Sequence, residues 1–171
     1  MGEGDSVMIK ILRVDDRLLH GQVAQSWASF YHLDKIFIIN NEVENDEFSK
    51  VTLNLAKPKN IELLIFELTT CKEALLDALK NDDRVMVIVE NFKDAWLVHE
   101  MLPSIHSINI GGYRNKSDKN ALVFNRFVIL REEDIEICKR LINKGVKLEI
   151  RQIPAEKEQL IDLSEDLNGK I

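Results

Sequence analysis

The residues best suited to chemistry in this chain lie together in one short segment, residues 13–23. His20 supplies an imidazole that can act as a nucleophile, and Arg17 supplies a permanent cation whose forked donors suit phosphate oxygens. Gly21 permits close approach of the backbone or an unusual dihedral angle, and Gln22 can donate or accept a hydrogen bond at the rim. An imidazole flanked by an arginine and a glycine is suited to accepting a phosphoryl group.

This segment follows an apolar stretch at residues 8–14 and precedes a helical pattern that starts near Gly21, so we predict a strand-to-helix turn. In open α/β sheets, ligands gather beyond the carboxyl ends of strands, where a helix start directs N–H groups and a positive dipole at them. These positive features favour neutral imidazole, which keeps the lone pair that a nucleophile needs. Asp15 or Asp16 would then accept a hydrogen bond from the other ring nitrogen or hold Arg17 in place.

Short apolar runs rich in Ile and Val alternate with longer helical patterns along the rest of the chain. Several runs are continuously apolar, which is typical of strands buried on both faces. We predict strands at residues 8–14, 35–40, 61–67, 84–90, 105–110, 121–130 and 146–153, and helices at 21–31, 46–57, 70–80, 92–102, 131–143 and 155–167. The repeated strand–helix order predicts one α/β domain with a mostly parallel, doubly wound sheet of about seven strands and helices on both faces.

One polar segment, residues 111–120, breaks this alternation because it joins two predicted strands without a helix between them. We predict a loop there, flanked by strands that are antiparallel or lie at a sheet edge. The pair Gly111 and Gly112 is interpreted either as a turn or as part of a loop that borders the histidine pocket together with Arg114 and Lys116.

The composition restricts the class of protein. A formal net charge of −6 argues against a nucleic-acid surface, and 45% hydrophobic with 30% charged residues suits a soluble globular domain without a membrane span. Cys71 and Cys138 lack zinc-type or disulfide spacing and are interpreted as buried small hydrophobic residues. We interpret residues 1–7 as a tag remnant or disordered tail, Met8 as the natural start and residues 8–171 as the domain.

The other histidines, His32, His99 and His106, have no metal-binding spacing with one another or with clustered carboxylates. We interpret them as core or surface residues and expect no metal site. The chain also has neither a dinucleotide-binding glycine pattern nor a P-loop sequence, so we expect no nucleotide cofactor.

Residues 13–23, Arg-Val-Asp-Asp-Arg-Leu-Leu-His-Gly-Gln-Val, resemble the active-site motif R-[VI]-D-x-R-L-[IL]-H-G-Q-V of the mannose/fructose/sorbose-class enzyme IIB of the bacterial sugar phosphotransferase system. Every fixed position of that motif is matched. Residues 108–112 are similar to the family's strand that ends in a glycine pair, and residues 145–154 are similar to its last strand and terminal proline. The resemblance covers most of the chain but not residues 1–7.

This resemblance implies a cytoplasmic phosphocarrier that associates peripherally with a membrane transporter. His20 would accept a phosphoryl group from enzyme IIA on the ring nitrogen nearest the backbone and pass it to a sugar imported by the membrane subunits IIC and IID. The activity would be that of a protein-Nπ-phosphohistidine–sugar phosphotransferase without metal or cofactor. Asp15 and Arg17 match catalytic positions of the motif, and Arg17, Gly21 and Gln22 match positions that would bind phosphate. The family's α/β fold with a seven-stranded sheet agrees with the strand pattern.

Two alternatives belong to other functional classes. A regulatory phosphoprotein or scaffold could keep the fold and the phosphosite without serving a transporter, although the intact motif argues against lost chemistry. A phosphatase with a histidine nucleophile is the weaker alternative, because that class usually carries Arg-His-Gly, whereas Leu19 precedes His20 here.

Overall fold

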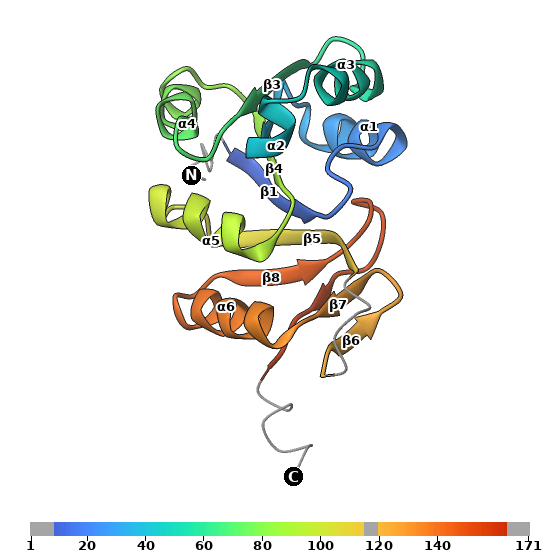
Figure 1. Ribbon diagram of the computed structural model, residues 1–171, viewed down its shortest axis with the longest axis vertical. Coiled ribbons are helices and arrows are strands. Elements are labelled where there is room, and N and C mark those ends of the chain that lie inside the picture. Colours follow the sequence, from blue (N-terminus) through green and yellow to red (C-terminus); the bar gives the residue numbers. More distant parts are fainter. Residues whose placement is uncertain (1–8, 115–119, 164–171) are drawn as a thin grey trace, which may run out of the picture.

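The computed structural model describes residues 9–114 and 120–163 (Figure 1). Its strands are β1 (Ile9–Asp15), β2 (Lys35–Ile39), β3 (Glu62–Phe66), β4 (Val85–Val89), β5 (Ser107–Arg114), β6 (Leu122–Asn125), β7 (Val128–Leu130), β8 (Lys147–Ile150) and β9 (Gln159–Leu160). Its helices are α1 (Gly21–Tyr31), α2 (Asn41–Glu44), α3 (Glu47–Ala56), α4 (Cys71–Lys80), α5 (Phe92–Met101) and α6 (Glu132–Asn143).

The strands form one mixed sheet in the order β3-β2-β4-β1-β5-β7-β6, with β8 paired to β5 and β9 paired to β8. The β6–β7 and β8–β9 pairings are antiparallel, and the other pairings are parallel. The predicted single α/β domain with a mostly parallel, doubly wound sheet is therefore confirmed. Because the chain leaves β1 toward β2 and leaves β5 toward the other edge, the carboxyl ends of β1 and β5 flank the crevice where such folds bind ligands.

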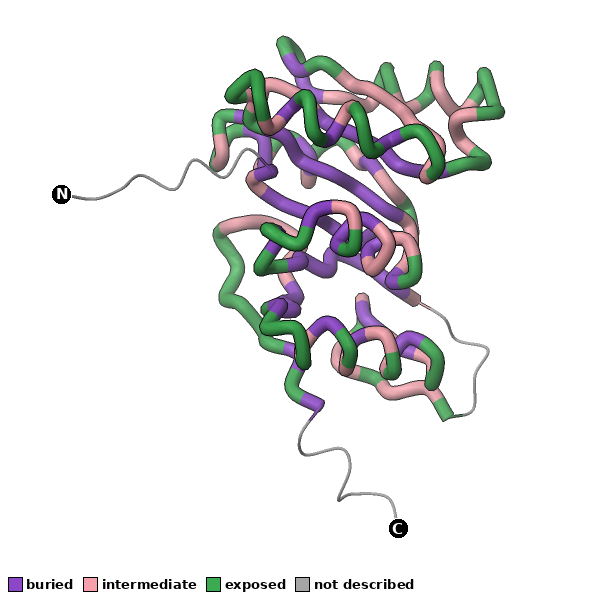
Figure 2. Tube along the Cα trace, turned by 90° about the vertical axis from the view of Figure 1, so that its left-hand side faces the viewer, coloured by how far each residue is buried: buried purple, intermediate pink, exposed green. Residues whose placement is uncertain are grey.

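Each face of the sheet carries its own hydrophobic core, as the continuously apolar strands predict. Along β2, Ile36 and Ile38 pack on one side, whereas Phe37 and Ile39 pack on the other. Helices α1 and α3 contribute to the first core, and α4, α5 and α6 contribute to the second. Figure 2 shows the buried strands in the centre, with the exposed faces of the helices turned outward. β1 is therefore packed on both faces, and its carboxyl end leads into the segment that contains His20.

Three predicted elements differ from the structure in the second half of the chain. Residues 121–130 form the hairpin β6–β7 rather than one strand, because the Asn125 side chain accepts hydrogen bonds from the N–H groups of Phe127 and Val128 at 2.8 and 3.0 Å and turns the chain. Strand β5 continues through Arg114, so the loop predicted from residue 111 was wrong for its first four residues. The position of β6 at the edge of the sheet agrees with the prediction.

The helix predicted at residues 155–167 was also wrong over its described part. Strand β9 lies there instead and pairs with β8, and Ile161 and Leu163 are both buried. Burial of every second residue is the period of extended chain, not of a helix. On α1, Trp27 is fully buried against the sheet, whereas Phe30 is 55% exposed.

Residues 1–7, interpreted as a tag remnant or tail, lie outside the described residues, as do residues 164–167 of the predicted last helix. Within residues 9–114 and 120–163, no helix combines the length and the apolar character that crossing a bilayer requires.

Candidate functional site

The turn between β1 and α1 carries His20 at the carboxyl edge of the sheet. Leu18 adopts a left-handed conformation with φ 56°, and its N–H donates to the carbonyl of Asp15 at 2.9 Å. His20 then occupies the N-cap position of α1 in an extended conformation, and its carbonyl accepts the first helical hydrogen bond, from Ala24, at 3.0 Å. The His20 side chain does not cap the helix, so the imidazole is available for another contact.

That contact is with Asp15. The imidazole Nε2 lies 3.1 Å from Asp15 Oδ2, with the His20 side chain 28% exposed and the Asp15 side chain fully buried. Burial by itself would raise the pKa of the Asp15 carboxyl, but the hydrogen bond with His20, the charge of Arg13 and the N–H of Arg17 together hold this pKa below its ordinary value. An ionised carboxylate only accepts hydrogen bonds, so in the neutral ring Nε2 carries the proton and Nδ1 keeps its lone pair.

Asp16 has a different partner from Asp15. Its carboxylate accepts a hydrogen bond from the Arg114 side chain at 2.6 Å and another from the Arg114 N–H at 2.8 Å. The Asp16 N–H donates to the carbonyl of Gly112 at 2.8 Å. Of the two aspartates, Asp15 therefore contacts the imidazole, whereas Asp16 connects the turn to Gly112 and Arg114 on β5. That the glycine pair borders the histidine pocket stays a prediction. Lys116 lies outside the described residues.

Arg17 is exposed, and its guanidinium has no hydrogen bond or ion pair with any described residue. Asp15 accepts the Arg17 backbone N–H at 3.1 Å, so it holds the main chain of Arg17 and not its guanidinium. An exposed guanidinium three residues before the imidazole is free to bind anionic oxygens.

The first two residues of α1, Gly21 and Gln22, are exposed. A Cβ on Gly21 would lie 3.3 Å from the carbonyl oxygen of Ala56 at the end of α3, so this glycine serves close backbone approach rather than an unusual dihedral angle. The first turn of a helix has N–H groups without internal acceptors, and here they lie directly after His20. The site thus combines a partly exposed imidazole, an exposed guanidinium and a helix start, an arrangement that suits phosphate binding.

The structure adds buried polar residues that the sequence analysis missed. Arg13 is only 1% exposed, and it stands opposite Asn109 in the register of β1 and β5. Asn109 in turn stands opposite Glu149 in the register of β5 and β8. We call Asp15, Arg13, Asn109, Glu149 and Arg151 the buried polar row.

Hydrogen bonds connect each member of the buried polar row to the next, from Asp15 to Arg151. Arg13 donates to Asp15 Oδ2 at 2.9 Å and to Asn109 Oδ1 at 2.5 Å. Asn109 Nδ2 donates to Glu149 Oε1 at 3.0 Å, and Glu149 accepts from Arg151 Nε at 2.9 Å. The signal in the sequence was a single polar residue inside an apolar run, as in Ile-Asn-Ile at 108–110 and Leu-Glu-Ile at 148–150.

The other histidines take no part in this arrangement. His32 and His106 are exposed, whereas His99 is buried in α5, where burial lowers its pKa. Among the described residues, no group of three His, Cys, Asp or Glu side chains is arranged to hold a metal ion.

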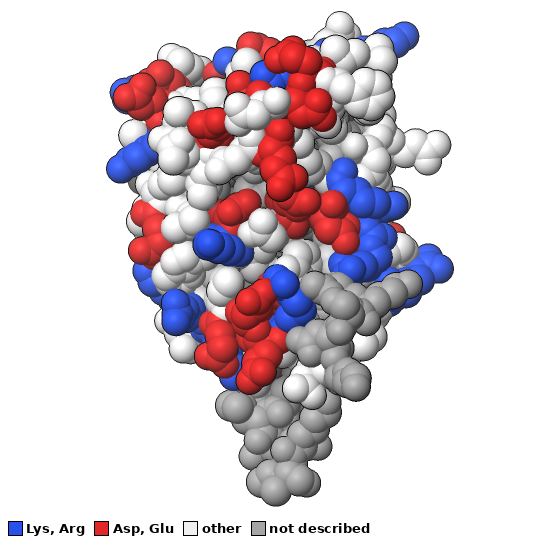
Figure 3. Space-filling view, in the orientation of Figure 1, with Lys and Arg blue, Asp and Glu red and all other residues white. Residues whose placement is uncertain are grey.

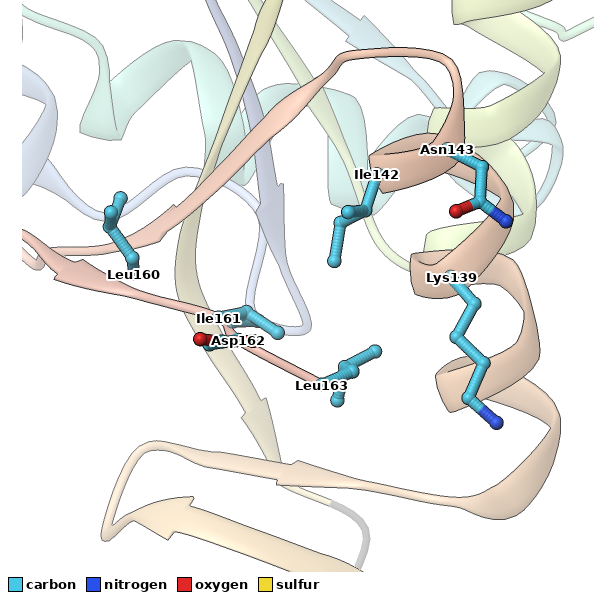
Figure 4. Close-up of a pocket in the computed structure, with 7 residues that line it drawn as sticks. All are labelled: Lys139, Ile142, Asn143, Leu160, Ile161, Asp162 and Leu163. Carbon is cyan, nitrogen blue, oxygen red and sulfur yellow. The ribbon is translucent and has the colours of Figure 1, made fainter. Parts of the chain in front are cut away.

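Charge and shape differ between the site and other parts of the surface. Figure 3 shows acidic side chains over much of one face, with basic side chains gathered along the edge at which β1 and β5 end. A groove of about 500 Å³ lies elsewhere, between α6 and the segment around β9 (Figure 4). Its lining contains none of the residues around His20, but consists of Lys139, Ile142, Asn143, Leu160, Ile161, Asp162 and Leu163.

Comparisons with known proteins agree with this geometry. The family model described as PTS system sorbose subfamily IIB component matches residues 9–168. The sorbose-specific EIIB component of Lacticaseibacillus casei is 29% identical over 166 residues, which is 96% of each protein. The crystal structure of the IIBSor domain of the sorbose permease from Klebsiella pneumoniae has a TM-score of 0.80 and 27% identity, and the match covers 90% of this chain and 93% of that one.

A longer relative is also similar. The mannose-specific EIIAB component of the same kind of system from Escherichia coli strain K12 is 30% identical over 164 residues, which is 95% of this chain. The chain spans half the length of that protein, since the match covers 50% of it.

Proposed function

The chain belongs to the sorbose subfamily of IIB components of the sugar phosphotransferase system, and on this premise we propose that it is a phosphocarrier whose acceptor is His20. His20 accepts a phosphoryl group from a phosphohistidine of enzyme IIA and transfers it to a sugar that enters through the membrane subunits IIC and IID. The protein then acts at the cytoplasmic side of the membrane as a protein-Nπ-phosphohistidine–sugar phosphotransferase.

The observation that supports this proposal most strongly is that the two ring nitrogens of His20 have different surroundings. Nε2 is engaged by the buried Asp15 carboxylate at 3.1 Å, and no described residue forms a hydrogen bond with Nδ1. The His20 side chain is 28% exposed, so a second protein can reach part of the ring while Asp15 holds it in place. A fixed nucleophile with a free lone pair is what in-line transfer between two histidines requires.

The transfer itself is a displacement at phosphorus. Nδ1 of His20 forms a bond to phosphorus as the bond between phosphorus and the donor nitrogen breaks, and that electron pair returns to the donor ring. In the second transfer, a sugar hydroxyl oxygen attacks phosphorus, the Nδ1–phosphorus bond breaks with its electron pair returning to Nδ1, and the hydroxyl proton passes to water. Neither step needs a metal or nucleotide from this chain, because positioning and charge stabilisation supply most of the catalysis in phosphoryl transfer.

Three groups are proposed to stabilise the transferred phosphoryl oxygens. The exposed Arg17 guanidinium can donate two parallel hydrogen bonds, and the N–H groups at Gly21 and Gln22 lie at the positive end of the α1 dipole. Because Asp15 lies on the far side of the ring at Nε2, its negative charge does not meet the phosphate directly.

The test is phosphorylation of the purified protein by its phosphorylated IIA donor. We expect mass spectrometry to find one acid-labile phosphate on wild type and none on His20→Ala. His106→Ala is the matched control, since His106 is exposed and precedes β5 at the opposite edge of the sheet, and it should be labelled like wild type.

Two results would change the account. Label that persists in His20→Ala would overturn the assignment of the acceptor. Label that reaches His20 but never reaches sugar, with IIC and IID present, would favour the regulatory phosphoprotein over the transport phosphocarrier.

A further inference from the structure

The buried polar row contains a cation that the phosphoryl transfer does not use directly. Arg13 lies on β1 two residues before Asp15, and both side chains point to the α1 face of the sheet. The Arg13 guanidinium is 6.0 Å from the centre of the Trp27 ring, which closes the row from that side. A fully buried guanidinium is costly unless carboxylates and hydrogen-bond acceptors compensate it, so its partners deserve explanation.

We propose that Arg13 is a positioning residue, held by Asn109 and Glu149, which fixes Asp15 and through it the Nε2–H tautomer of His20. Arg13 touches neither His20 nor the phosphoryl group. It acts by donating to Asp15 Oδ2, the same oxygen that contacts Nε2, at 2.9 Å. The other oxygen, Oδ1, accepts the Arg17 N–H at 3.1 Å, so hydrogen bonds at both oxygens restrain rotation of the carboxylate away from the ring.

Asn109 and Glu149 determine where the Arg13 guanidinium lies. Asn109 can offer its carbonyl oxygen to Arg13 only if its amide group faces the other way, and Glu149 accepts that amide at 3.0 Å. The carbonyl oxygen of Arg151 also accepts from Arg13, at 3.1 Å. Asn109 lies on β5, Glu149 lies on β8 and Arg151 directly follows β8, so the register of three strands directs one guanidinium toward one carboxylate.

Gly111 supports the same inference independently. A Cβ on Gly111 would overlap the Arg13 guanidinium, whereas a Cβ on Gly112 would come within 2.8 Å of Arg114, a side chain that is less buried and can shift. The first glycine of the pair therefore leaves room for Arg13. Its backbone needs no positive φ, so space rather than conformation explains the glycine.

The alternating charges give the row a second consequence. Asp15, Arg13, Glu149 and Arg151 sum to zero formal charge, so the carboxylate that orients the imidazole is already compensated before phosphate arrives. Arg13 thereby reduces the repulsion between Asp15 and a phosphoryl group on the same ring. Arg151 extends the row toward Glu158, which is 40% exposed at 3.3 Å.

The direct test is the tautomer of His20, read from the ¹⁵N chemical shifts of the imidazole in the whole protein at about pH 8, well above the ordinary histidine pKa of about 6.5. We expect wild type to hold the Nε2–H form. Arg13→Met should increase the Nδ1–H form and slow phosphorylation by about tenfold to a hundredfold, as expected for loss of a charge-assisted hydrogen bond. Arg13→Lys should keep more of the Nε2–H form and of the phosphorylation rate than Arg13→Met, since one ammonium can reach Asp15 but not every acceptor of the guanidinium.

Gly111→Ala and Glu149→Gln keep the proposal testable if Arg13→Met does not fold. Gly111→Ala displaces the Arg13 guanidinium without changing any charge. Glu149→Gln removes the negative charge next to the Asn109 amide while keeping the size of the side chain. Both should shift the tautomer in the same direction. Arg131→Met, which removes an arginine that does not contact Asp15, should leave the His20 tautomer unchanged.

The kinetic part of this inference rests on the proposed function, but the tautomer does not. If wild type is never phosphorylated while the variants still shift the tautomer, the proposed function fails and the role of Arg13 stands. If folded Gly111→Ala and Glu149→Gln keep the wild-type tautomer and the wild-type rate, Arg13 merely joins strands and the inference is overturned.

Discussion

Two aspartates are buried in the described part of this molecule, and each is paired with an arginine. In the buried polar row, Arg13 donates to Asp15 at 2.9 Å. On α6, Arg131 donates to Asp134 at 3.0 Å, and the Tyr113 hydroxyl donates to the same carboxylate. We call Tyr113, Arg131 and Asp134 the helix-capping set.

The buried carboxylates of the two sets differ in what they contact. The Asp134 carboxylate accepts the N–H of Arg131 at 3.0 Å, so the helix-capping set closes the start of α6, and its hydrogen bonds stay within the fold. The Asp15 carboxylate contacts instead an imidazole whose side chain is 28% exposed. A buried carboxylate–arginine pair is therefore no sign of function by itself; the distinguishing feature at Asp15 is its contact with a partly exposed imidazole.

The largest difference is expected between Asp15→Asn and Asp134→Asn. The first variant should phosphorylate about 10²–10⁴-fold more slowly, because an amide no longer fixes the imidazole tautomer. The second should keep the wild-type rate and lose about 1–3 kcal/mol of unfolding free energy, because a buried cap loses its charge-assisted bonds. Rates of transfer from phosphorylated IIA, with denaturant unfolding of each variant, check both. Equal rate losses in the two variants would remove the distinction between the sets.

Arg17→Ala should lower the rate of phosphorylation without changing the free energy of unfolding. Arg17 is exposed, so we expect about tenfold to a hundredfold slower phosphorylation and a change in unfolding free energy within about 0.5 kcal/mol. Arg84→Ala is a suitable control, because Arg84 pairs with Asp34 at the opposite end of the sheet and should leave the rate unchanged. An Arg17→Ala protein that transfers phosphate at the wild-type rate would show that this guanidinium does not bind the phosphoryl group.

Tyr113→Phe tests the structural side with a smaller change. The Tyr113 hydroxyl lies between Asp134 at 3.0 Å and Arg131 at 2.9 Å, and burial raises its pKa. Losing this hydroxyl should cost about 1 kcal/mol of unfolding free energy, measured in urea, without changing phosphorylation. A slower transfer rate at unchanged stability would place Tyr113 with the site instead.

The smallest effect concerns a second contrast, between His20 with its carboxylate and His99, a buried histidine whose Nδ1 has no partner among the described residues. Burial lowers the pKa of His99, so the folded state favours the neutral ring. This contribution to stability is complete above the ordinary histidine pKa of about 6.5 and is lost as pH falls through the lower folded-state pKa. Urea unfolding at pH 7.5 and 5.5 should show a smaller decrease for His99→Leu than for wild type; identical decreases would contradict it.

The site could be predicted where its residues are contiguous. Asp15, Arg17 and His20 follow one another between an apolar strand and an amphipathic helix, and that order alone places them at the carboxyl edge of the sheet. The sequence could not indicate which of two adjacent aspartates meets the imidazole. The strand alternates its faces, so the choice depends on how β1 is oriented against α1.

The rest of the buried polar row was beyond local reasoning. Arg13, Asn109 and Glu149 are far apart in sequence and meet only because β1, β5 and β8 pair in a particular register. That register follows from packing of the whole sheet. The helix predicted at residues 155–167 was wrong for a similar reason. A polar segment with a few apolar residues is compatible with either a helical or an extended spacing, and pairing with β8 made it extended.

In the proposed mechanism, Asp15 occupies one ring nitrogen of His20 and leaves the other to carry phosphate. The most direct measurement is ¹⁵N and ³¹P NMR of the protein after phosphorylation by IIA, with the His20 ring labelled. The account predicts phosphate on Nδ1 and a proton retained on Nε2. Phosphate on Nε2, the nitrogen that contacts Asp15, would contradict it.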